Sequence, residues 1–533
     1  MNAAWLMSLV LLFLVVGYFY YGRRLEGWFG VSDEKRTPAY RLRDGLDYEP
    51  APLPVLFGHH FASIAGAGPI IGPILAASYG WLGVLLWLVL GAVFAGGVHD
   101  MGAILASVKH DGRSIGELIR RYVRPEAQKV FLAFAWVTLV LIIAAFDVIV
   151  AKTFTHSPPV ATASVLFLLL AVLFGFLRRL GMPLLPLSLL GILGLGGAIW
   201  LGFRFPWSLP QTTWQWLLFV YVFIAGVTPV WILLQPRDYL NAFLLYGLLG
   251  AGVLGIFLKH PTVKLPLYTG FVNDLGPLFP ILFVITSCGA ISGFHSLVGS
   301  GTTAKQLSKE SQARPVGYGA MLLETVLGMV ALLAVATLPF LAYQEELRHS
   351  GPIGAFASGV GGFLAALGIP EPKGVAFAAL AVSAFALTSL DTATRVARFA
   401  LEELLPKNVA RRKGLLFVTT AASVGLAAAL AFTGTWRSIW PLMGTANQLL
   451  AALALLALLA WLRSQKRFYA FLKWPAIFML LVTLSALGLL LYKNWGKNHL
   501  LVGLSALLLL LALYIARAGL FSQTPGRSPQ RIL

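Results

Sequence analysis

The stretch GHHFASIAGAGPIIGPILAASYG, from Gly58 to Gly80, is apolar and long enough to enter a bilayer, yet it contains adjacent histidines, several glycines and two prolines. Glycine and proline at membrane depth free backbone groups from the helical hydrogen-bond ladder. Such groups are tolerated only where protein or a water-filled cavity satisfies them. The motif Gly66-Ala67-Gly68-Pro69 falls at the centre of a span expected over 57–78. The stretch therefore predicts a membrane helix interrupted halfway across the lipid.

The composition of the 533-residue chain indicates an all-α polytopic membrane protein. Hydrophobic residues make up 58% and charged residues 11%, against about 25% charged in ordinary globular proteins. Apolar runs of about 20 residues, each sufficient for a ~30 Å hydrocarbon core, recur along the whole length. Fifteen spans are predicted, at residues 3–21, 57–78, 82–107, 128–151, 160–177, 182–203, 214–234, 239–258, 279–300, 318–341, 375–392, 414–433, 439–462, 474–492 and 499–516.

Basic residues are distributed unequally between the two sides of these spans. The net charge of +19 fits basic cytoplasmic loops better than a nucleic-acid partner. With fifteen spans, 31 of the 40 Lys and Arg residues fall in alternate loops on one side. We therefore expect the N-terminus outside and the C-terminus in the cytoplasm. The first apolar run is followed, not preceded, by Arg23 and Arg24, which indicates a retained anchor rather than a cleaved signal peptide.

Several chemistries lack their sequence signals. The single cysteine, Cys288, excludes an internal disulfide and a thiolate zinc cluster. The chain has no P-loop motif, no H-E-x-x-H and no evident Ser/His/Asp set. We expect neither an enzyme nor a cofactor.

A second interruption is predicted in YVFIAGVTPVWILLQPRDYL, where Gly226, Thr228 and Pro229 fall at the centre of span 214–234. That span is the fifth after 57–78, so the two run in opposite directions. An inverted-repeat transporter needs such a pair, because half-helix N-termini attract an anionic group and loosened carbonyls hold a cation. The alternative is that each Gly-Pro is a packing kink. The transporter interpretation divides the chain into an anchor helix with its loop (1–56), a first five-helix repeat (57–213), an inverted second repeat (214–400) and four additional helices with a tail (401–533).

Polar residues inside the second half of the chain are candidates for binding or coupling, because ionisable groups in a membrane are expensive. Ser292 and His295 are three residues apart in span 279–300, so one helix face is expected to carry both. A histidine there can bind substrate or carry a proton, or it can be a buried residue satisfied by a neighbouring helix. Trp231 follows the Pro229 break and either lines a pocket or packs.

Four residues near the inner ends of the second and third spans form a further candidate group: His59, His60, His99 and Asp100. Together they can relay protons at an inner gate or hold a divalent metal such as zinc. Adjacent helical residues point about 100° apart, so neither pair chelates by itself. We favour the proton-linked or packing role, and these residues remain the candidates if a metal binds.

Three charged residues are predicted at an inner gate. Arg237 and Asp238 come just after span 214–234 and are expected to cap the gate. Asp391 lies near the inner end of span 375–392, where it either coordinates a cation or pairs with Arg395 one turn below.

Several strings taken together resemble the carbon starvation protein A family: TPAYRLRDGLDYEP, GHHFASIAGAGPIIGPILAASYGW, GGVHDM, SIGEL, PVWILLQPRDYLN and SGFHSLVGSGTTAKQL. The likeness runs in order from about residue 30 to residue 400. It implies a bacterial inner-membrane transporter of peptides or pyruvate, the latter with protons, in the amino acid–polyamine–organocation superfamily with a LeuT-like 5+5 core. The family motifs map onto His59, His60, Gly66, Gly68, Pro69, His99, Asp100, Pro229, Arg237, Asp238, Ser292, His295 and Thr302.

The combined expectation is a proton-coupled symporter that imports a short peptide or a pyruvate-like carboxylate. The carboxylate would sit against backbone amides around Gly66–Pro69 and Gly226–Pro229, with His295 linked to the proton. The alternatives are a sodium-coupled amino-acid or peptide transporter, a metal-binding nutrient sensor, a channel and an intramembrane enzyme. The expected partners are the small-molecule substrate and membrane lipid, with no nucleic acid, and a homo-oligomer is left open.

Overall fold

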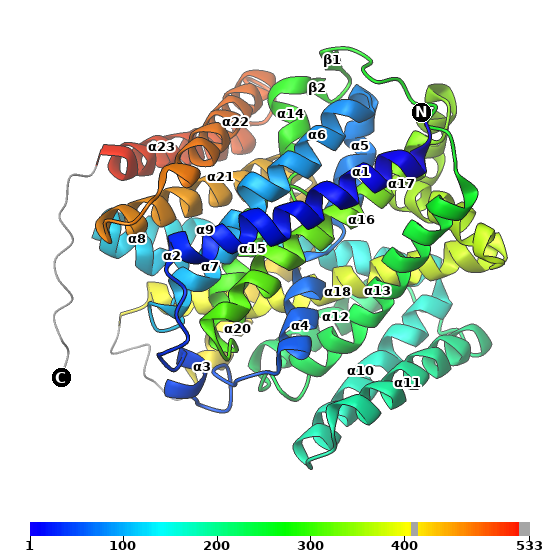
Figure 1. Ribbon diagram of the computed structural model, residues 1–533, viewed down its shortest axis with the longest axis horizontal. Coiled ribbons are helices and arrows are strands. Elements are labelled where there is room, and N and C mark those ends of the chain that lie inside the picture. Colours follow the sequence, from blue (N-terminus) through cyan, green and yellow to red (C-terminus); the bar gives the residue numbers. More distant parts are fainter. Residues whose placement is uncertain (407–413, 522–533) are drawn as a thin grey trace.

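The computed structural model describes residues 1–406 and 414–521 as a bundle of helices with one small β-hairpin (Figure 1). The helices before the hairpin are α1 (Ala3–Val16), α2 (Gly22–Phe29), α3 (Pro38–Arg41), α4 (Leu53–Ile64), α5 (Gly68–Ala76), α6 (Trp81–Gly91), α7 (Gly97–Val108), α8 (Ile115–Tyr122), α9 (Pro125–His156), α10 (Pro158–Arg179), α11 (Leu184–Arg204), α12 (Gln211–Val227) and α13 (Leu234–Lys259). Short π-helical turns at Gly17–Tyr21 and Ala92–Gly96 make α1–α2 and α6–α7 continuous.

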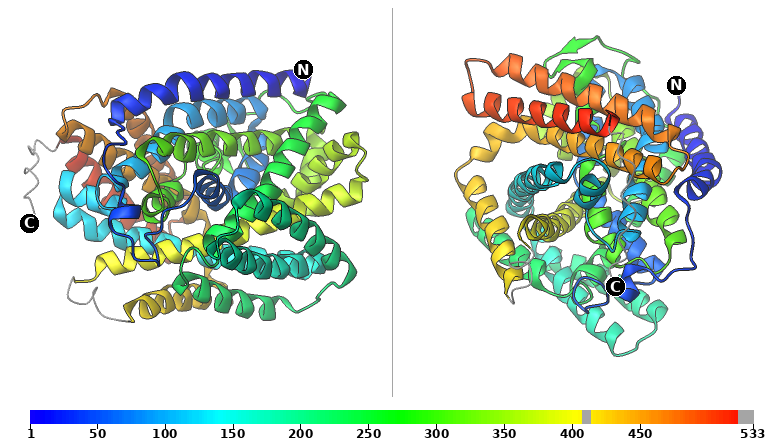
Figure 2. Two further views of the ribbon diagram at one scale, coloured as in Figure 1. Left: turned by 60° about the horizontal axis from the view of Figure 1, so that its bottom comes forward. Right: turned by 90° about the vertical axis from the view of Figure 1, so that its left-hand side faces the viewer.

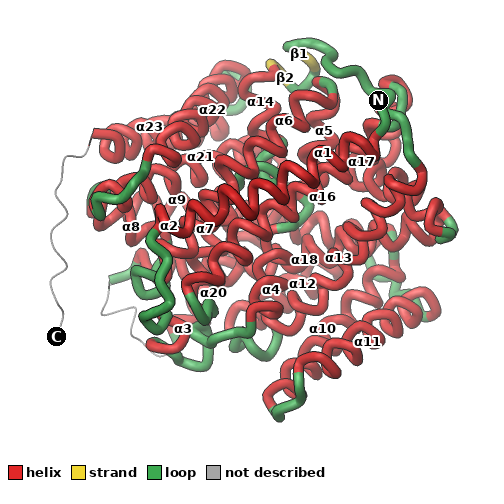
Figure 3. Tube along the Cα trace, viewed as in Figure 1, coloured by secondary structure: helices red, strands yellow, loops and turns green. Residues whose placement is uncertain are grey.

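The second half of the chain begins with the antiparallel strands β1 (Val272–Asn273) and β2 (Gly276–Pro277). The helices that follow are α14 (Leu278–Ile285), α15 (Gly293–Gly301), α16 (Ala320–Ala336), α17 (Phe340–Leu364), α18 (Glu371–Leu404), α20 (Leu415–Phe432), α21 (Thr435–Ser464), α22 (Ala470–Asn494) and α23 (His499–Phe521). Loops lie mostly at the two ends of the bundle (Figure 3).

The number of spans is close to the fifteen predicted. Within the described residues, thirteen helices are long and apolar enough to cross a membrane, and the bent pair α4–α5 raises the number to fourteen. Two predicted spans do not form helices of spanning length. Helix α12 has 17 residues, and the predicted span 279–300 is divided into α14 and α15.

One of the thirteen candidates, α17, occupies the segment predicted as the loop 342–374. Gly351 has a φ of 65° and precedes Pro352, so the helix is sharply kinked there. On one side of the kink, the Tyr343 hydroxyl donates to the carbonyl of Ile74 near the end of α5. On the other side, Lys259 at the end of α13 donates to the carbonyl of Gly362. Both halves therefore lie at the same end of the bundle, which explains why the charge pattern left no span here.

Contacts between loops place the loops on two opposite faces of the bundle. On one face Arg41 pairs with Asp111 at 2.5 Å and Lys109 with Glu310 at 2.7 Å. We call this the basic face, because most of the Lys- and Arg-rich loops meet there. On the opposite face the backbone amide of Ala3 donates to the carbonyl of Pro261 at 2.8 Å. This grouping agrees with the alternation of loops predicted from charge.

The two longest helices, α9 and α18, pack along each other in the middle of the bundle and are seen end-on in cyan and yellow in Figure 2. Helix α18 contains the run Ala384–Thr394, which is rich in Ala, Ser and Thr. Small residues let membrane helices approach closely, and their hydroxyls hydrogen-bond across the interface. The buried polar side chains of α18 therefore face other helices rather than lipid.

Candidate functional site

The interruption predicted at Gly66–Pro69 is confirmed. Helix α4 ends at Ile64, Ala65 leaves helical geometry with a ψ of 56°, and α5 begins at Gly68 after a bend of 43°. Pro69 lies in the first turn of α5, where its missing N–H costs no hydrogen bond. Ala67 and Pro69 are buried and Gly68 is half-buried. The break is therefore enclosed by protein, as backbone at membrane depth requires.

The prediction of a mid-span break at Gly226–Pro229 is wrong. Helix α12 ends at Val227 at the basic face, and residues 228–233 connect it to α13. The guanidinium of Arg395 donates to the carbonyls of Ala225 and Thr228, which are among the acceptors left free at the end of α12. Proline and glycine here end a helix rather than interrupt one.

The second interrupted helix is α14–α15, where residues 286–292 are not helical. Ser292 precedes α15 in extended geometry, so the prediction that it shares a helix face with His295 is wrong. Two side chains of α21 satisfy this break. The Asn447 side chain accepts from the amide of Phe294 at 2.8 Å and donates to Ser292, and Gln448 donates to the carbonyl of Ile291 at 3.2 Å.

The two breaks touch each other. A Cβ on Gly68 would lie 2.4 Å from the sulfur of Cys288, and one on Gly72 would lie 2.2 Å from the carbonyl oxygen of Ile285. Only glycine allows this approach of backbone to backbone. The structure thus brings Gly66–Pro69 together with the unwound part of the second interrupted helix.

Replacing Gly72 with alanine is expected to lower stability by about 1–3 kcal/mol, because the added methyl group forces one backbone away from another. The matched control is Gly197→Ala in α11, where an added Cβ meets nothing within 4 Å. Thermal unfolding in detergent should show a lower midpoint for Gly72→Ala only. Equal midpoints would contradict the close packing of the two breaks.

A buried histidine–carboxylate cluster, called here the Asp100 cluster, lies where α7, α15 and α16 meet. Asp100 accepts from His99 at 2.7 Å and from His295 at 2.9 Å. The other ring nitrogen of His295 is 3.4 Å from a carboxylate oxygen of Glu324. All four side chains are fully buried, and neither oxygen of Glu324 has a hydrogen-bond partner among the described residues. The cluster can therefore hold and pass a proton between imidazole and carboxylate groups.

A second cluster, called here the Asp238 cluster, joins α4, α13 and α18. His59 hydrogen-bonds Asp238 at 2.6 Å, and Ser63 contacts both Asp238 and Thr392. Arg237 and Asp238 lie in the first turns of α13, and both are almost completely buried.

Asp391 belongs to the same cluster. Arg237 and the Tyr221 hydroxyl both donate to one of its oxygens. The predicted ion pair between Asp391 and Arg395 is wrong, because Arg395 pairs with a different carboxylate.

The four inner residues His59, His60, His99 and Asp100 do not share one set of hydrogen bonds. His59 belongs to the Asp238 cluster, while His99 and Asp100 belong to the Asp100 cluster. His60 hydrogen-bonds the hydroxyl of Thr303 at 2.8 Å. Among residues 1–406 and 414–521, no three His, Cys, Asp or Glu side chains are grouped so that they could hold a metal ion.

An ion-pair network lies at the basic face. Asp47, in the loop before α4, accepts from Arg395 at 2.6 Å and from Arg398 at 2.8 and 2.7 Å. Burial alone raises the pKa of Asp47, but the positive charges of Arg398, Arg395 and Lys305 outweigh it and lower the pKa to about 2. The network ties the start of α4, the end of α12 and α18 together. Trp231 lies beside it, stacked under Arg179.

A model of the family described as carbon starvation protein CstA matches residues 2–348 and 342–486. The chain belongs to the carbon starvation protein CstA family. This CstA-family chain is 34% identical to the peptide transporter CstA of Escherichia coli (strain K12), over 91% of its own length and 80% of the relative's. It is 32% identical to the pyruvate/proton symporter BtsT of the same organism, over 92% and 82%. The family resemblance seen in the sequence is confirmed, and the protein is a multi-pass membrane transporter rather than an enzyme.

The fold of this CstA-family chain is similar to that of a manganese transporter from Eremococcus coleocola. The TM-score is 0.51 at 14% identity, covering 90% of this chain and 97% of the other. At this identity the likeness concerns the fold alone.

Sequence reasoning missed several residues of the site, among them Asp47, Tyr221, Asn447 and Gln448. Asn447 and Gln448 are adjacent residues with amide side chains in an otherwise apolar span, and polar residues in such a span indicate a functional or structural site. Asp47 lies among other polar residues and Tyr221 within an apolar run, and nothing local distinguishes either of them.

Proposed function

We propose that the chain has a LeuT-like core of two inverted five-helix repeats: α4–α5, α6–α7, α9, α12 and α13, then α14–α15, α16, α18, α20 and α21. The packing pairs recur between the two sets. Helix α4 packs on α13 as α15 packs on α21, and α12 packs on α9 as α20 packs on α18. The hairpin α10–α11 and the kinked α17 are then insertions. This proposal moves the start of the second repeat from residue 214 to residue 278.

We infer that the protein is a proton-coupled symporter that imports short peptides or pyruvate-like carboxylates across a bacterial inner membrane, with the basic face toward the cytoplasm. The observation that carries this proposal is the meeting of two interrupted helices beside buried histidine–carboxylate clusters. Relatives described as a peptide transporter and as a pyruvate/proton symporter support the substrate class.

The carboxylate of the substrate is proposed to lie between the N-termini of α5 and α15. Neither end is capped by the side chain of its own N-cap residue, although Asn447 accepts from the Phe294 amide of α15, and both helices point their positive dipole ends into the zone of the two breaks. Gly68 and Cys288 are half-buried there, while their neighbours in the breaks are mostly buried. The site therefore uses Gly66–Pro69 as expected and replaces Gly226–Pro229 with residues 286–292.

Uptake into proteoliposomes, with and without an inward proton gradient and with and without sodium, tests the function. We expect uptake of a peptide or a 2-oxo acid to rise with the proton gradient. A sodium-driven rise would instead favour the hydroxyl-rich contact between α4 and α18, where Ser389 donates to the carbonyl of Ser63. Binding without exchange of substrate across the membrane would indicate a sensor and contradict transport.

Modification of Cys288 is expected to block most uptake, and bound substrate is expected to slow the modification. The reason is that Cys288 faces Gly68 at the proposed site, so an attached group would occupy the space proposed for the substrate. A small methanethiosulfonate reagent reports on this residue alone, because Cys288 is the only cysteine. The matched control is Cys288→Ser, whose uptake should resist the reagent. Full uptake after complete modification would place the substrate elsewhere.

A further inference from the structure

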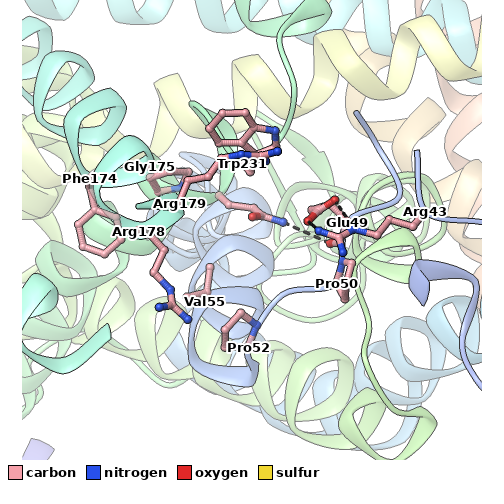
Figure 4. Close-up of a pocket in the computed structure, with 12 residues that line it drawn as sticks. Arg43, Glu49, Pro50, Pro52, Val55, Phe174, Gly175, Arg178, Arg179 and Trp231 are labelled. Carbon is pink, nitrogen blue, oxygen red and sulfur yellow. Dashed lines mark hydrogen bonds and ion pairs between the residues drawn. The ribbon is translucent and has the colours of Figure 1, made fainter. Parts of the chain in front are cut away.

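A cavity of about 330 Å³ opens at the basic face, and none of the residues that line it belongs to either cluster. It lies between the end of α10, the loop before α4 and the segment leading into α13 (Figure 4). Arg178 and Arg179 extend into it from α10, Trp231 covers one side, and Arg43 with Glu49 closes the other.

The cavity carries positive charge that the protein does not neutralise. Glu49 forms a two-pronged ion pair with Arg43, so these two charges cancel. In the part of the chain that the structure describes, Arg178 donates to the carbonyl of Met182 and Arg179 stacks on Trp231 at 4.0 Å, and neither contacts a carboxylate. Two guanidinium groups without a carboxylate partner at one concave site attract a phosphate group, because a guanidinium can bind two phosphate oxygens at once.

The helix ends around the cavity add to this potential. Pro52 is the N-cap residue of α4, and Gln235 and Pro236 lie in the first turn of α13. All three line the cavity, which therefore faces the positive ends of two helix dipoles.

The border of the cavity is apolar and faces outward. The hairpin α10–α11 lies at the edge of the bundle (Figure 1). On α10, next to the lining residues Phe174 and Gly175, Leu173 is 54% exposed and Phe176 is 49% exposed. The cavity thus lies beside an apolar surface suited to acyl chains, while its own lining carries the basic side chains. It is at the end of a membrane-spanning helix, where lipid headgroups lie.

We propose that this cavity binds a phosphate-bearing anion, supplied in the membrane by the headgroup of an anionic phospholipid. The phosphate lies in the cavity that Arg178 and Arg179 line, and the acyl chains run along α10. A free phosphate offers the same oxygens to the arginines but makes no contact with the apolar border. The bound lipid holds Trp231 and the segment that leads to Arg237 and Asp238, so it stabilises the folded transporter.

The test measures lipid binding to the full-length protein in detergent. Short-chain phosphatidylglycerol is titrated against thermal unfolding, with phosphatidylcholine and inorganic phosphate as comparison ligands. We expect phosphatidylglycerol to raise Tm and phosphatidylcholine to leave it unchanged. In Arg178→Gln/Arg179→Gln the apparent affinity should fall about tenfold or more, since two charge-assisted contacts are lost. The matched control, Arg204→Gln, removes an exposed arginine at the far end of the same hairpin and should behave as the unmodified protein does.

The outcomes separate the two sources of phosphate. A Tm rise with inorganic phosphate as large as that with the lipid supports a phosphate site but overturns the lipid as its occupant. Equal responses to both lipids, or an undiminished response in the double variant, overturn the site. If the double variant does not fold, Arg178→Lys/Arg179→Lys is measured by native mass spectrometry instead. This variant keeps both positive charges but loses the paired N–H donors, so it should retain less phosphatidylglycerol than the unmodified protein. Equal retention of the lipid overturns the site.

Discussion

Replacing Asp47 with alanine is expected to destabilise the protein by about 3–5 kcal/mol, the usual cost of removing one partner of a buried ion pair. Asp47 is the common acceptor for Arg395 and Arg398, whose side chains are 1% and 2% exposed. Without it two guanidinium groups stay buried with no carboxylate between them. Arg395 also satisfies the end of α12, so the damage extends to the connection between α12 and α13.

The contribution of Asp47 should depend on pH in a defined direction. Its folded-state pKa is lowered to about 2, whereas an unperturbed Asp has a pKa of about 3.9. A lowered pKa means that the stabilisation is fully present above about pH 4 and is lost as the pH falls toward about 2. The difference in unfolding free energy between the unmodified protein and Asp47→Asn should therefore be constant from pH 5 to pH 8 and shrink below about pH 4.

The matched control for both measurements is Glu34→Gln, an exposed carboxylate in the loop between α2 and α3. Thermal and denaturant unfolding in detergent should show no change for it. If Asp47→Ala were as stable as Glu34→Gln, the network would not hold the basic face together.

The first interruption could be predicted from the sequence because its cause is local. Gly66, Gly68 and Pro69 weaken the helix wherever they lie in a span. The second interruption has a tertiary cause: the run Thr286–Ser292 contains no proline, and its freed backbone groups are satisfied by Asn447 and Gln448 from another helix. Conversely, Pro229 carries a strong local signal but stands at the end of α12, where proline has no mid-span effect.

The ion pairs could not be predicted from sequence spacing either. Asp391 and Arg395 are one turn apart on α18, so sequence spacing favours pairing them. In the fold, Arg237 from α13 reaches Asp391, and Asp47 from a loop reaches Arg395. The sequence identified most of the polar residues in the clusters. It did not identify their partners, because the partners depend on which helices pack together.

Replacing Glu324 with glutamine is expected to remove proton-driven accumulation of substrate while leaving exchange of substrate across the membrane intact. Glutamine keeps the shape of the side chain but cannot bind and release a proton. One proton moving down a gradient of one pH unit supplies about 1.4 kcal/mol, which is about tenfold in substrate concentration. An uncoupled carrier loses that factor, so accumulation should fall from about tenfold toward equality on the two sides.

The position of Glu324 is what makes this variant informative. Its carboxylate is fully buried, and His295 is the nearby group that can give or take its proton, at 3.4 Å. His295→Ala should therefore weaken uptake more than folding, and combining it with Glu324→Gln should add little, because both remove the same step. The control is Glu126→Gln, an exposed carboxylate in the first turn of α9. Undiminished accumulation in folded Glu324→Gln would assign coupling to the other buried cluster, where His59 and Asp238 form the equivalent pair.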